Sequence, residues 1–289
     1  MINVVHTIAE ARAELDAVRH AGGTVGLVPT MGFLHDGHKS LMARSVADNT
    51  ATLVTIFVNP LQFAPDEDLE AYPRSIDADV ALCESAGVAV VLVPSVDEMY
   101  PLQPVVTTVT VDGVSAPLEG ESRPTHFAGV ATVVSKLFNI GGVCRAYFGE
   151  KDWQQLAVIR RMAVDLSFPV EVVGCSIIRE ANGLAMSSRN VYLTDAEREA
   201  AGVLNRALQS GIDAIDGGES DAAAIQALVR EIIAAEPLVA DPDYVAVVDA
   251  ASLQSINPLV GEVRLLLAAQ VGKARLIDNM GITIDRRER

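Results

Sequence analysis

The stretch TVGLVPTMGFLHDGHKSLMARSVAD, residues 24–48, carries the clearest fold signal in the chain. Residues 24–29 are mostly apolar and predict a short buried strand, whereas residues 38–48 are typical of a helix. Between them, Gly32 and Gly37 allow the backbone to turn tightly and to approach a ligand closely. A strand, a glycine-containing loop and a helix in this order predict the first unit of a parallel α/β sheet.

The alternation of strand and helix patterns continues on both sides of this stretch. Upstream, Thr7 and Glu10 form a capping-box pattern, which predicts a helix that ends near residues 21–23. Downstream, strands are expected at residues 52–58, 88–93, 145–148 and 170–173, and helices at residues 75–86, 127–139 and 153–165. Strand–helix repetition with short connections predicts a Rossmann-like, doubly wound parallel sheet.

The sequence pattern changes near residue 178. A polar stretch at residues 179–190 precedes a second capping box, Thr194 to Glu197, which predicts a long helix that ends near residue 214. The remaining elements are expected to be a helix at residues 221–234 and strands at residues 244–248, 263–268 and 274–278. We therefore expect two domains, a Rossmann-like domain at residues 1–177 and a smaller α+β domain at residues 178–289, as the length of 289 residues also suggests.

Composition and charge exclude several classes of protein. The 22 Lys and Arg against 38 Asp and Glu give a formal charge of −16, which argues against extended binding of nucleic acid or of an anionic membrane. The N-terminus lacks a signal-peptide pattern, and no apolar run is long enough to span a bilayer, so a cytoplasmic protein is expected. Three widely spaced cysteines without a C-x-x-C pair predict reduced thiols in or near the cores.

Polar motifs follow the predicted strands, where ligands bind in open parallel sheets. His35 and His38 lie three residues apart at the start of a helix, whose N-terminal N–H groups favour phosphate. An imidazole there can stabilise charge that develops on phosphoryl oxygens. The alternatives are that the two histidines cap the helix or bind a metal ion.

Two further motifs carry charge suited to phosphate. Gly149–Asp152 follows a predicted strand, and Lys151 within it can act as a point charge on phosphate, although an isolated motif of this kind is often a solvated turn. Met186–Arg189 offers two hydroxyls and a guanidinium, which can bind a triphosphate or simply form a polar loop. The loop after the second strand adds Gln62, and Gln155 lies one helical turn beyond Lys151.

The motifs also carry a family resemblance that covers nearly the whole chain. They are PTMGFLHDGH at 29–38, FVNPLQF at 57–63, YPRS at 72–75, RPTHFAGVATVVSKLFN at 123–139, FGEKDWQQL at 148–156, REANGLAMSSRN at 179–190 and RLIDN at 275–279. In this order and spacing they resemble the pantothenate synthetase (pantoate–β-alanine ligase) family of the nucleotidylyltransferase superfamily. The resemblance implies ATP-dependent condensation of (R)-pantoate with β-alanine through a pantoyl adenylate, with release of AMP and pyrophosphate.

The resemblance also implies roles for single residues, with Mg2+ accompanying ATP and a homodimer as the usual assembly. The implied catalytic residues are His35, His38 and Lys151, with His38 as proton donor. The implied ATP-binding residues are Met31, Gly32, His35, Gly37, His38, Gly149, Glu150, Lys151, Asp152, Ile178, Met186, Ser187, Ser188 and Arg189. Gln62 and Gln155 would bind pantoate, Gln62 would also lie near β-alanine, Arg123 and His126 would line the pantoate end, and Asp77 and Asp79 are candidate Mg2+ ligands.

Three residues depart from the pattern of this family: Phe33, Trp153 and Asn182. None of them removes an implied phosphate or pantoate contact, so they affect local packing rather than the class of reaction. Two alternatives remain open at this point. One is a nucleotidylyltransferase that delivers the nucleotide to another acceptor, and the other is a nucleotide-binding module in which the histidines serve affinity only.

Overall fold

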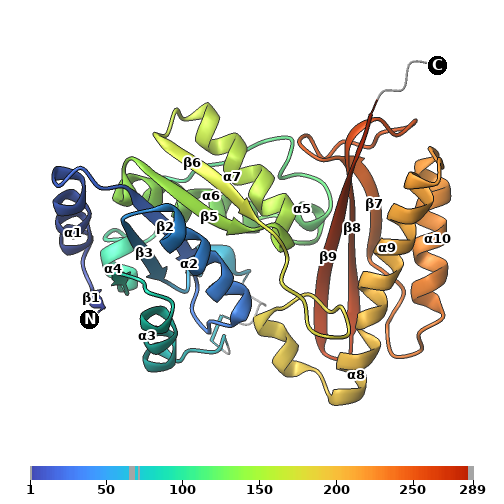
Figure 1. Ribbon diagram of the computed structural model, residues 1–289, viewed down its shortest axis with the longest axis horizontal. Helices are drawn as coiled ribbons and strands as arrows, with labels where there is room; N and C mark the ends of the chain where they lie inside the picture. Colours follow the sequence, from blue (N-terminus) through green and yellow to red (C-terminus); the bar gives the residue numbers. More distant parts are fainter. Residues whose placement is uncertain (1, 65–68, 71, 286–289) are drawn as a thin grey trace. The chain divides into compact units, whose positions relative to one another are not determined.

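The computed structural model describes residues 2–64, 69–70 and 72–285. Contacts divide the chain into two compact units (Figure 1). The first unit comprises Met1–Glu150 and Gln154–Ser176, and the second comprises Lys151–Trp153 and Ile177–Arg289. The three-residue turn Lys151–Trp153 therefore groups with the second unit, although its chain neighbours on both sides belong to the first.

The first unit is built on a six-stranded sheet whose strands are all parallel, in the order β1-β4-β3-β2-β5-β6. The strands are β1 (Asn3–Val5), β2 (Val25–Thr30), β3 (Ala51–Ile56), β4 (Val90–Leu92), β5 (Cys144–Gly149) and β6 (Val170–Cys175). All six residues of β3 are buried, as expected for a central strand covered on both faces. The predicted doubly wound parallel sheet is confirmed.

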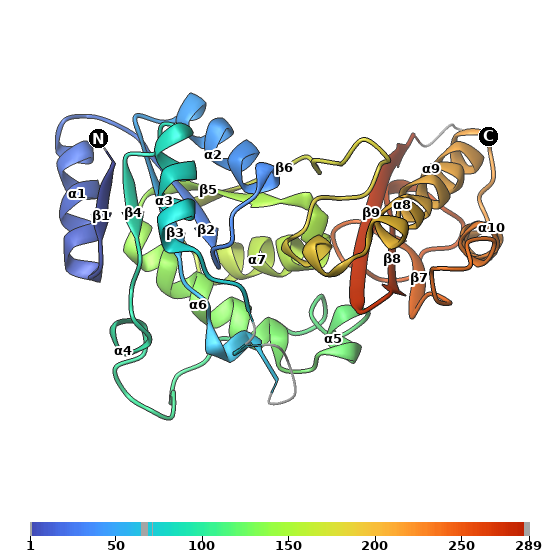
Figure 2. The same cartoon turned by 90° about the horizontal axis from the view of Figure 1, so that it is seen from below.

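Helices connect these strands and cover the sheet. They are α1 (Ile8–His20), α2 (Asp36–Asp48), α3 (Ile76–Ser85), α4 (Val96–Met99), α5 (Glu119–Ser122), α6 (His126–Gly141) and α7 (Trp153–Asp165), with short 3-10 turns η1 (Pro60–Gln62) and η2 (Glu150–Asp152). From β2 the chain winds through α2 toward β3, and from β5 it winds through α7 toward β6 in the opposite direction. Right-handed crossovers therefore place α2 on one face and α7 on the other, as Figure 2 shows.

This reversal of direction places a topological switch point between β2 and β5. In open α/β sheets, ligands bind beyond the carboxyl ends of the strands at such a point. The loop that leaves β2 ends at His35, His38 lies in the first turn of α2, and β5 ends at Gly149. The sheet order thus puts two of the predicted motifs at the carboxyl ends of adjacent strands.

The second unit has an antiparallel sheet of β7 (Tyr244–Asp249), β8 (Gly261–Val271) and β9 (Ala274–Ile284). Its helices are α8 (Asp195–Ala200), α9 (Gly202–Asp216) and α10 (Ala222–Ala234), and a 3-10 turn, η3, spans Ser188–Tyr192. Buried side chains of α9, α10 and the sheet form one hydrophobic core. Leu204, Leu208, Val229 and Leu265 are almost completely buried within it.

Some short elements were not expected from the sequence, and one expected helix is wrong. The strand β1 was not predicted, because three residues at the edge of a sheet give too short a pattern. The predicted single helix after Thr194 is two helices that meet at Ala201. The chain bends there because Gly202 packs against the backbone of Asn182, where a Cβ would lie 2.6 Å from the carbonyl oxygen.

The cysteines and the helices agree with the expectations from composition. All three cysteines are unpaired, and Cys83 and Cys144 are buried. Burial raises the pKa of both thiols to about 12, so they remain protonated and pack as small apolar groups. Among the described residues, no helix has the length and hydropathy needed to cross a bilayer.

Truncation of Leu27 tests the core of the first unit. This side chain is fully buried on the central strand β2. We expect Leu27→Ala to lower the free energy of unfolding of this unit by about 2–5 kcal/mol, because the cavity left behind does not close completely. The matched control is Leu166→Ala, since that side chain is 51% exposed. Urea unfolding monitored by circular dichroism measures the free energy of unfolding of both variants. Equal losses in the two variants would contradict the assignment of Leu27 to the core.

Candidate active site

The loop after β2 is held by one buried carboxylate. Gly32 and Phe33 both have positive φ, +85° and +52°, so the chain reverses sharply between the strand and α2. Asp79, on α3 and 3% exposed, accepts the N–H of Phe33 at 2.9 Å and the N–H of Leu34 at 2.7 Å, one on each oxygen. A Cβ on Gly32 would lie 3.0 Å from one of these oxygens. Asp79 therefore fixes the path of the backbone that leads to the two histidines.

The histidines form a cap on α2, which is one of the readings that the sequence left open. The Nδ1 atom of His35, the N-cap residue, accepts the N–H of Gly37 at 3.1 Å. The Nδ1 atom of His38 accepts the N–H of His35 at 3.3 Å, and the two ring centroids are 4.1 Å apart. Because both Nδ1 atoms are acceptors, a neutral ring carries its proton on Nε2 in each case. The cap thus fixes the tautomers that make both rings Nε2–H donors.

The two candidate metal ligands differ in their surroundings. Both oxygens of Asp79 accept backbone N–H groups, whereas Asp77 is exposed on the first turn of α3. Within the described part of the chain, no group of three or more His, Cys, Asp or Glu side chains could hold a metal ion. The bonds of Asp79 make it first of all a support for the loop.

A second polar cluster follows β3, where the turn η1 positions Gln62. Asn59 is fully buried, and its Nδ2 donates to Oε1 of Gln62 at 2.9 Å and to the carbonyl of Gly129 at 3.1 Å. Its Oδ1 accepts the hydroxyl of Tyr100 at 2.8 Å. Burial raises the pKa of Tyr100 well above its usual range, so the hydroxyl stays protonated and can donate. The buried amide of Asn59 therefore orients the amide of Gln62.

Arg123 and His126 meet Gln62 from the other side, through its backbone. Nη2 of Arg123 donates to the carbonyl of Gln62 at 3.1 Å, and Nδ1 of His126 lies 3.0 Å from the same oxygen. A carbonyl only accepts, so Nδ1 of His126 is the donor. The close fit of α6 on this turn needs Gly129, where a Cβ would lie 2.1 Å from the carbonyl oxygen of Leu61. The structure thus brings together three residues that the sequence assigned to the pantoate end.

The neighbouring glutamines at the start of α7 differ in their contacts. The Gln154 side chain is 3% exposed and holds the loop before α5, because its Nε2 donates to the carbonyls of Val114 and Pro117 and its Oε1 accepts the N–H of Glu119. Gln155 is half-buried, and its amide bonds to none of the other described side chains or backbone groups. Of the two, Gln155 is the one with hydrogen-bonding capacity for a ligand.

In the second unit, a closed loop carries the predicted Met186–Arg189 motif. The N–H of Met186 donates to the carbonyl of Ile178 at 2.9 Å, and Ser187 caps η3 through a bond from the N–H of Arg189 at 3.2 Å. Asn190, 4% exposed, closes the loop by donating to the carbonyl of Ala185 at 3.1 Å. Ile178, Met186, Ser187 and Arg189 are therefore brought together within this unit.

The other predicted phosphate motif is Gly149–Asp152, of which Lys151 and Asp152 belong to the second unit. The side chain of Lys151 is 20% exposed, and its Nζ lies 3.6 Å from Oδ1 of Asp152. The backbone carbonyl of Lys151 accepts a hydrogen bond from Nδ2 of Asn279 at 2.8 Å. Gly149 and Glu150, the other two residues of the motif, belong to the first unit.

Sequence reasoning missed the residues that hold these motifs in place. Asp79 was considered only as a candidate metal ligand and not as a support for the loop, and Asn59 was assigned no role. Asp278 and Asn279 were recognised only as part of a motif. A polar residue within a predicted buried element is the signal that could have identified these supports. Buried polar side chains are hydrogen-bonded in native structures, so such a residue indicates a partner elsewhere in the fold.

Fold and site together define a class of protein. A parallel sheet with a glycine turn and a helix N-terminus at its switch point is the arrangement that binds nucleotide phosphates in α/β enzymes. A model of the family described as pantoate–β-alanine ligase matches residues 3–281. The chain belongs to the pantoate–β-alanine ligase family, and it is an enzyme of the ligase class.

Individual relatives agree with this assignment. The chain is 52% identical over 278 residues to a pantothenate synthetase of Roseiflexus castenholzii, covering 96% of this chain and 98% of the relative. It is 51% identical over 283 residues to a pantothenate synthetase of Heliobacterium modesticaldum, and the match covers 98% of this chain and 100% of the relative.

Solved structures agree as well. A crystal structure of pantothenate synthetase from Thermus thermophilus matches with a TM-score of 0.90 and 46% identity, covering 96% of this chain and 99% of that chain. A pantoate–β-alanine ligase from Francisella tularensis, complexed with β,γ ATP and β-alanine, matches with a TM-score of 0.77 and 29% identity, covering 97% of each.

Replacement of Asp79 tests its role in holding the loop. Asp79→Asn places an amide NH2 against one of the two N–H groups, so the path toward His35 and His38 changes. We expect kcat for ligation to fall about 10²-fold, the loss that a misplacement of about 1 Å can cause. The matched control is Asp97→Asn, because Asp97 is exposed on α4.

A titration with Mg2+ separates this role from metal binding. If Asp79 supports the loop, kcat of the variant stays low at saturating Mg2+. Full recovery of kcat at high Mg2+ would contradict a role in the loop and favour a metal ligand.

Proposed function

We propose that this chain condenses (R)-pantoate with β-alanine to pantothenate in an ATP-dependent reaction with a pantoyl-adenylate intermediate. The observation that carries the proposal is the pair of Nε2–H donors at the switch point, fixed by the histidine cap, in a chain of this family. The homologue from Francisella tularensis, complexed with β,γ ATP and β-alanine, supports ATP and β-alanine as substrates.

The first step is the transfer of an adenylyl group. A carboxylate oxygen of pantoate forms a bond to the α-phosphorus of ATP, and the bond from this phosphorus to the bridging oxygen of pyrophosphate breaks. Negative charge increases on the departing pyrophosphate. Donors aimed at oxygens where charge develops lower the barrier, and the Nε2–H groups of His35 and His38 serve this purpose in our proposal. As the proton donor of this pair, His38 shares its Nε2–H in a hydrogen bond with an oxygen of the departing pyrophosphate, and the proton stays on the imidazole.

The second step forms the amide. The β-alanine amine attacks the acyl carbon of pantoyl adenylate, AMP leaves as its phosphate oxygen takes the electron pair, and the amine nitrogen loses its proton. No covalent bond to the protein is needed in either step. Positioning and electrostatic stabilisation therefore carry the catalysis.

The amide side chains bind the acid substrates in this proposal. Gln62 and Gln155 hydrogen-bond pantoate, and Gln62 also contacts β-alanine. The orientation of Gln62 by buried Asn59 supports this role, because an amide held from behind loses little rotational freedom when a ligand binds. Arg123 and His126 act on the same turn through the carbonyl of Gln62.

ATP is bound by the segments that carry the phosphate motifs in this proposal. The residues are Met31, Gly32, His35, Gly37, His38, Gly149, Glu150, Lys151, Asp152, Ile178, Met186, Ser187, Ser188 and Arg189. Lys151 and Arg189 act on phosphate oxygens as a point charge and as a bidentate donor. Mg2+ enters as the ATP complex, since Mg2+ in such sites is held largely by substrate phosphates and water, with Asp77 and Asp79 as candidate protein ligands.

The division of labour between the domains is part of the proposal. Residues 1–177 form the domain that binds nucleotide and pantoate, and residues 178–289 form a smaller domain that contributes Ile178 and Met186–Arg189. We also propose that the enzyme is a cytoplasmic homodimer that serves pantothenate and coenzyme A biosynthesis. Its formal charge of −16 disfavours binding to nucleic acid or to anionic membranes.

A product assay with single omissions tests the reaction. With ATP, pantoate and β-alanine present we expect pantothenate, AMP and pyrophosphate in equal amounts, and no pantothenate when any one substrate is left out. Exchange of labelled pyrophosphate into ATP should require pantoate but not β-alanine, because the adenylate forms first. Exchange that instead depends on a phosphate-ester acceptor would favour a nucleotidylyltransferase with another acceptor.

Replacement of His38 tests the proposed transition-state contact. We expect His38→Ala to lower kcat by about 10²-fold or more, the loss found on removing one such donor, while ATP affinity by calorimetry changes little. The matched control is His20→Ala, since His20 is exposed at the end of α1. A parental rate for His38→Ala would refute the catalytic role of His38, whereas a loss of ATP affinity would favour histidines that serve affinity only.

A further inference from the structure

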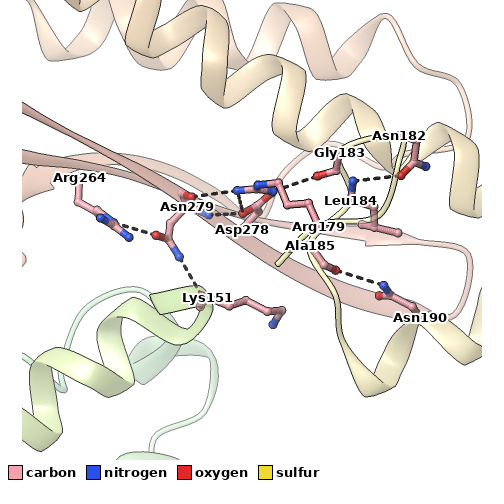
Figure 3. Close-up of polar contacts among 10 residues, drawn as sticks. All are labelled: Lys151, Arg179, Asn182, Gly183, Leu184, Ala185, Asn190, Arg264, Asp278 and Asn279. Carbon is pink, nitrogen blue, oxygen red and sulfur yellow. Dashed lines mark hydrogen bonds and ion pairs between the residues drawn. The ribbon is translucent and has the colours of Figure 1, made fainter. Parts of the chain in front are cut away.

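Two adjacent residues of β9, Asp278 and Asn279, are buried and take no direct part in the proposed reaction. They are 3% and 2% exposed. Successive side chains of a strand point to opposite faces, so neighbours of this kind contact different partners. Figure 3 shows the result, in which Asp278 meets Arg179 and Asn279 meets Arg264 and the backbone of Lys151.

Asn279 uses both ends of its amide. Its Nδ2 donates to the carbonyl of Lys151 at 2.8 Å, and its Oδ1 accepts the Nε–H of Arg264 at 2.8 Å. A buried amide with both ends satisfied has one orientation, because rotation by 180° would place donor against donor and acceptor against acceptor. The amide of Asn279 therefore fixes the position of the Lys151 carbonyl relative to β9.

Trp153, at the other end of the Lys151–Trp153 turn, is held by a cation–π contact and a hydrogen bond. The guanidinium of Arg264 lies 3.5 Å from the ring centroid of Trp153, and the indole Nε1 donates to the carbonyl of Ala250 at 2.8 Å. Arg264 is 9% exposed, so this cation–π contact is largely shielded from water. Asn279, Arg264 and Trp153 thus form a chain of contacts that explains why the Lys151 turn groups with the second unit.

Asp278 acts, through Arg179, on the segment that leads to the other phosphate motif of this unit. Its two oxygens accept Nη1 and Nη2 of Arg179 at 2.6 and 3.0 Å, a bidentate geometry. Nη1 of Arg179 also donates to the carbonyl of Gly183 at 3.0 Å, within the loop that leads to Met186–Arg189. One strand therefore contacts the Lys151 turn directly and, through Arg179, the loop that leads to Met186–Arg189.

We propose that Asn279 is a positioning residue that aims Lys151 at the phosphates of ATP, and that Asp278 does the same for the Met186–Arg189 loop through Arg179. The inference rests on the proposed function, in which Lys151 and Arg189 contact ATP. A merely structural role would predict that substitutions change stability alone. A positioning role predicts that they act on the rate through the residue they position.

The variant Asn279→Asp isolates the contact to Lys151. Aspartate keeps the shape of the side chain and an acceptor for Arg264, but it cannot donate to the carbonyl of Lys151. We expect kcat for pantoate-dependent pyrophosphate exchange to fall about 10- to 100-fold, with KM for pantoate unchanged. The matched control is Asn139→Asp, which removes a similar bond to a backbone carbonyl, from Nδ2 of Asn139 to Ser135 at 2.9 Å on α6.

A double-mutant cycle with Lys151→Ala decides between the two roles. If Asn279 acts through the Lys151 side chain, Asn279→Asp lowers kcat in the parent but causes less than a twofold further loss in the Lys151→Ala background. Likewise, if Asp278 acts through Arg189, Asp278→Asn lowers kcat in the parent but causes less than a twofold further loss in the Arg189→Ala background. Thermal unfolding of each variant is measured in parallel and reports any loss of folded protein.

The outcomes separate failure of this inference from failure of the proposed function. Equal losses from Asn279→Asp in both backgrounds, or no loss in the parent, would overturn the positioning role while leaving Lys151 in place. A parental rate for Lys151→Ala would refute the role of Lys151 itself, and the inference would fall with it. A large loss for Lys151→Ala together with suppression of the Asn279→Asp effect supports both.

Discussion

The site of the first unit depends on one electrostatic constraint, the contact of the buried Asp79 carboxylate with two backbone N–H groups. The loop after β2 passes through two residues with positive φ, one of them the non-glycine residue Phe33, a conformation that is unfavourable without support. Two charge-assisted hydrogen bonds supply that support. The loop then enters α2 with its histidines already in the cap, so a residue on a different helix determines where the imidazoles lie.

The fold could be predicted largely because its signals are local. The apolar runs at 24–29 and 52–58, the capping boxes at Thr7 and Thr194, and the glycines that end helices each specify an element by themselves. The strand β1 and the break at Ala201 were missed for the opposite reason. β1 is stabilised by pairing with β4, about 85 residues away, and the break by packing of Gly202 on Asn182.

The chemistry of the candidate site could be predicted to a smaller extent. Residue types such as His, Lys and Arg at the ends of strands indicate where phosphate chemistry is expected, and the family resemblance supplies the reaction. The supports remain hidden in a sequence, because Asp79, Asn59 and Asn279 act through hydrogen bonds to the backbone of distant segments. A side-chain partner for a backbone N–H or carbonyl can come from anywhere in the chain, and no spacing rule identifies it.

The grouping of Lys151–Trp153 with the second unit has a consequence for any attempt to separate or recombine the two parts of the chain. The polypeptide passes between the units at three places, after Glu150, after Trp153 and after Ser176. A fragment that began at Ile177 would lack the tripeptide, and Asn279, Arg264 and the carbonyl of Ala250 would each lose a partner. A chimaera of two homologues joined at this last crossing would unite the tripeptide of one parent with the anchoring strand of the other. The natural module for exchange is therefore discontinuous in sequence.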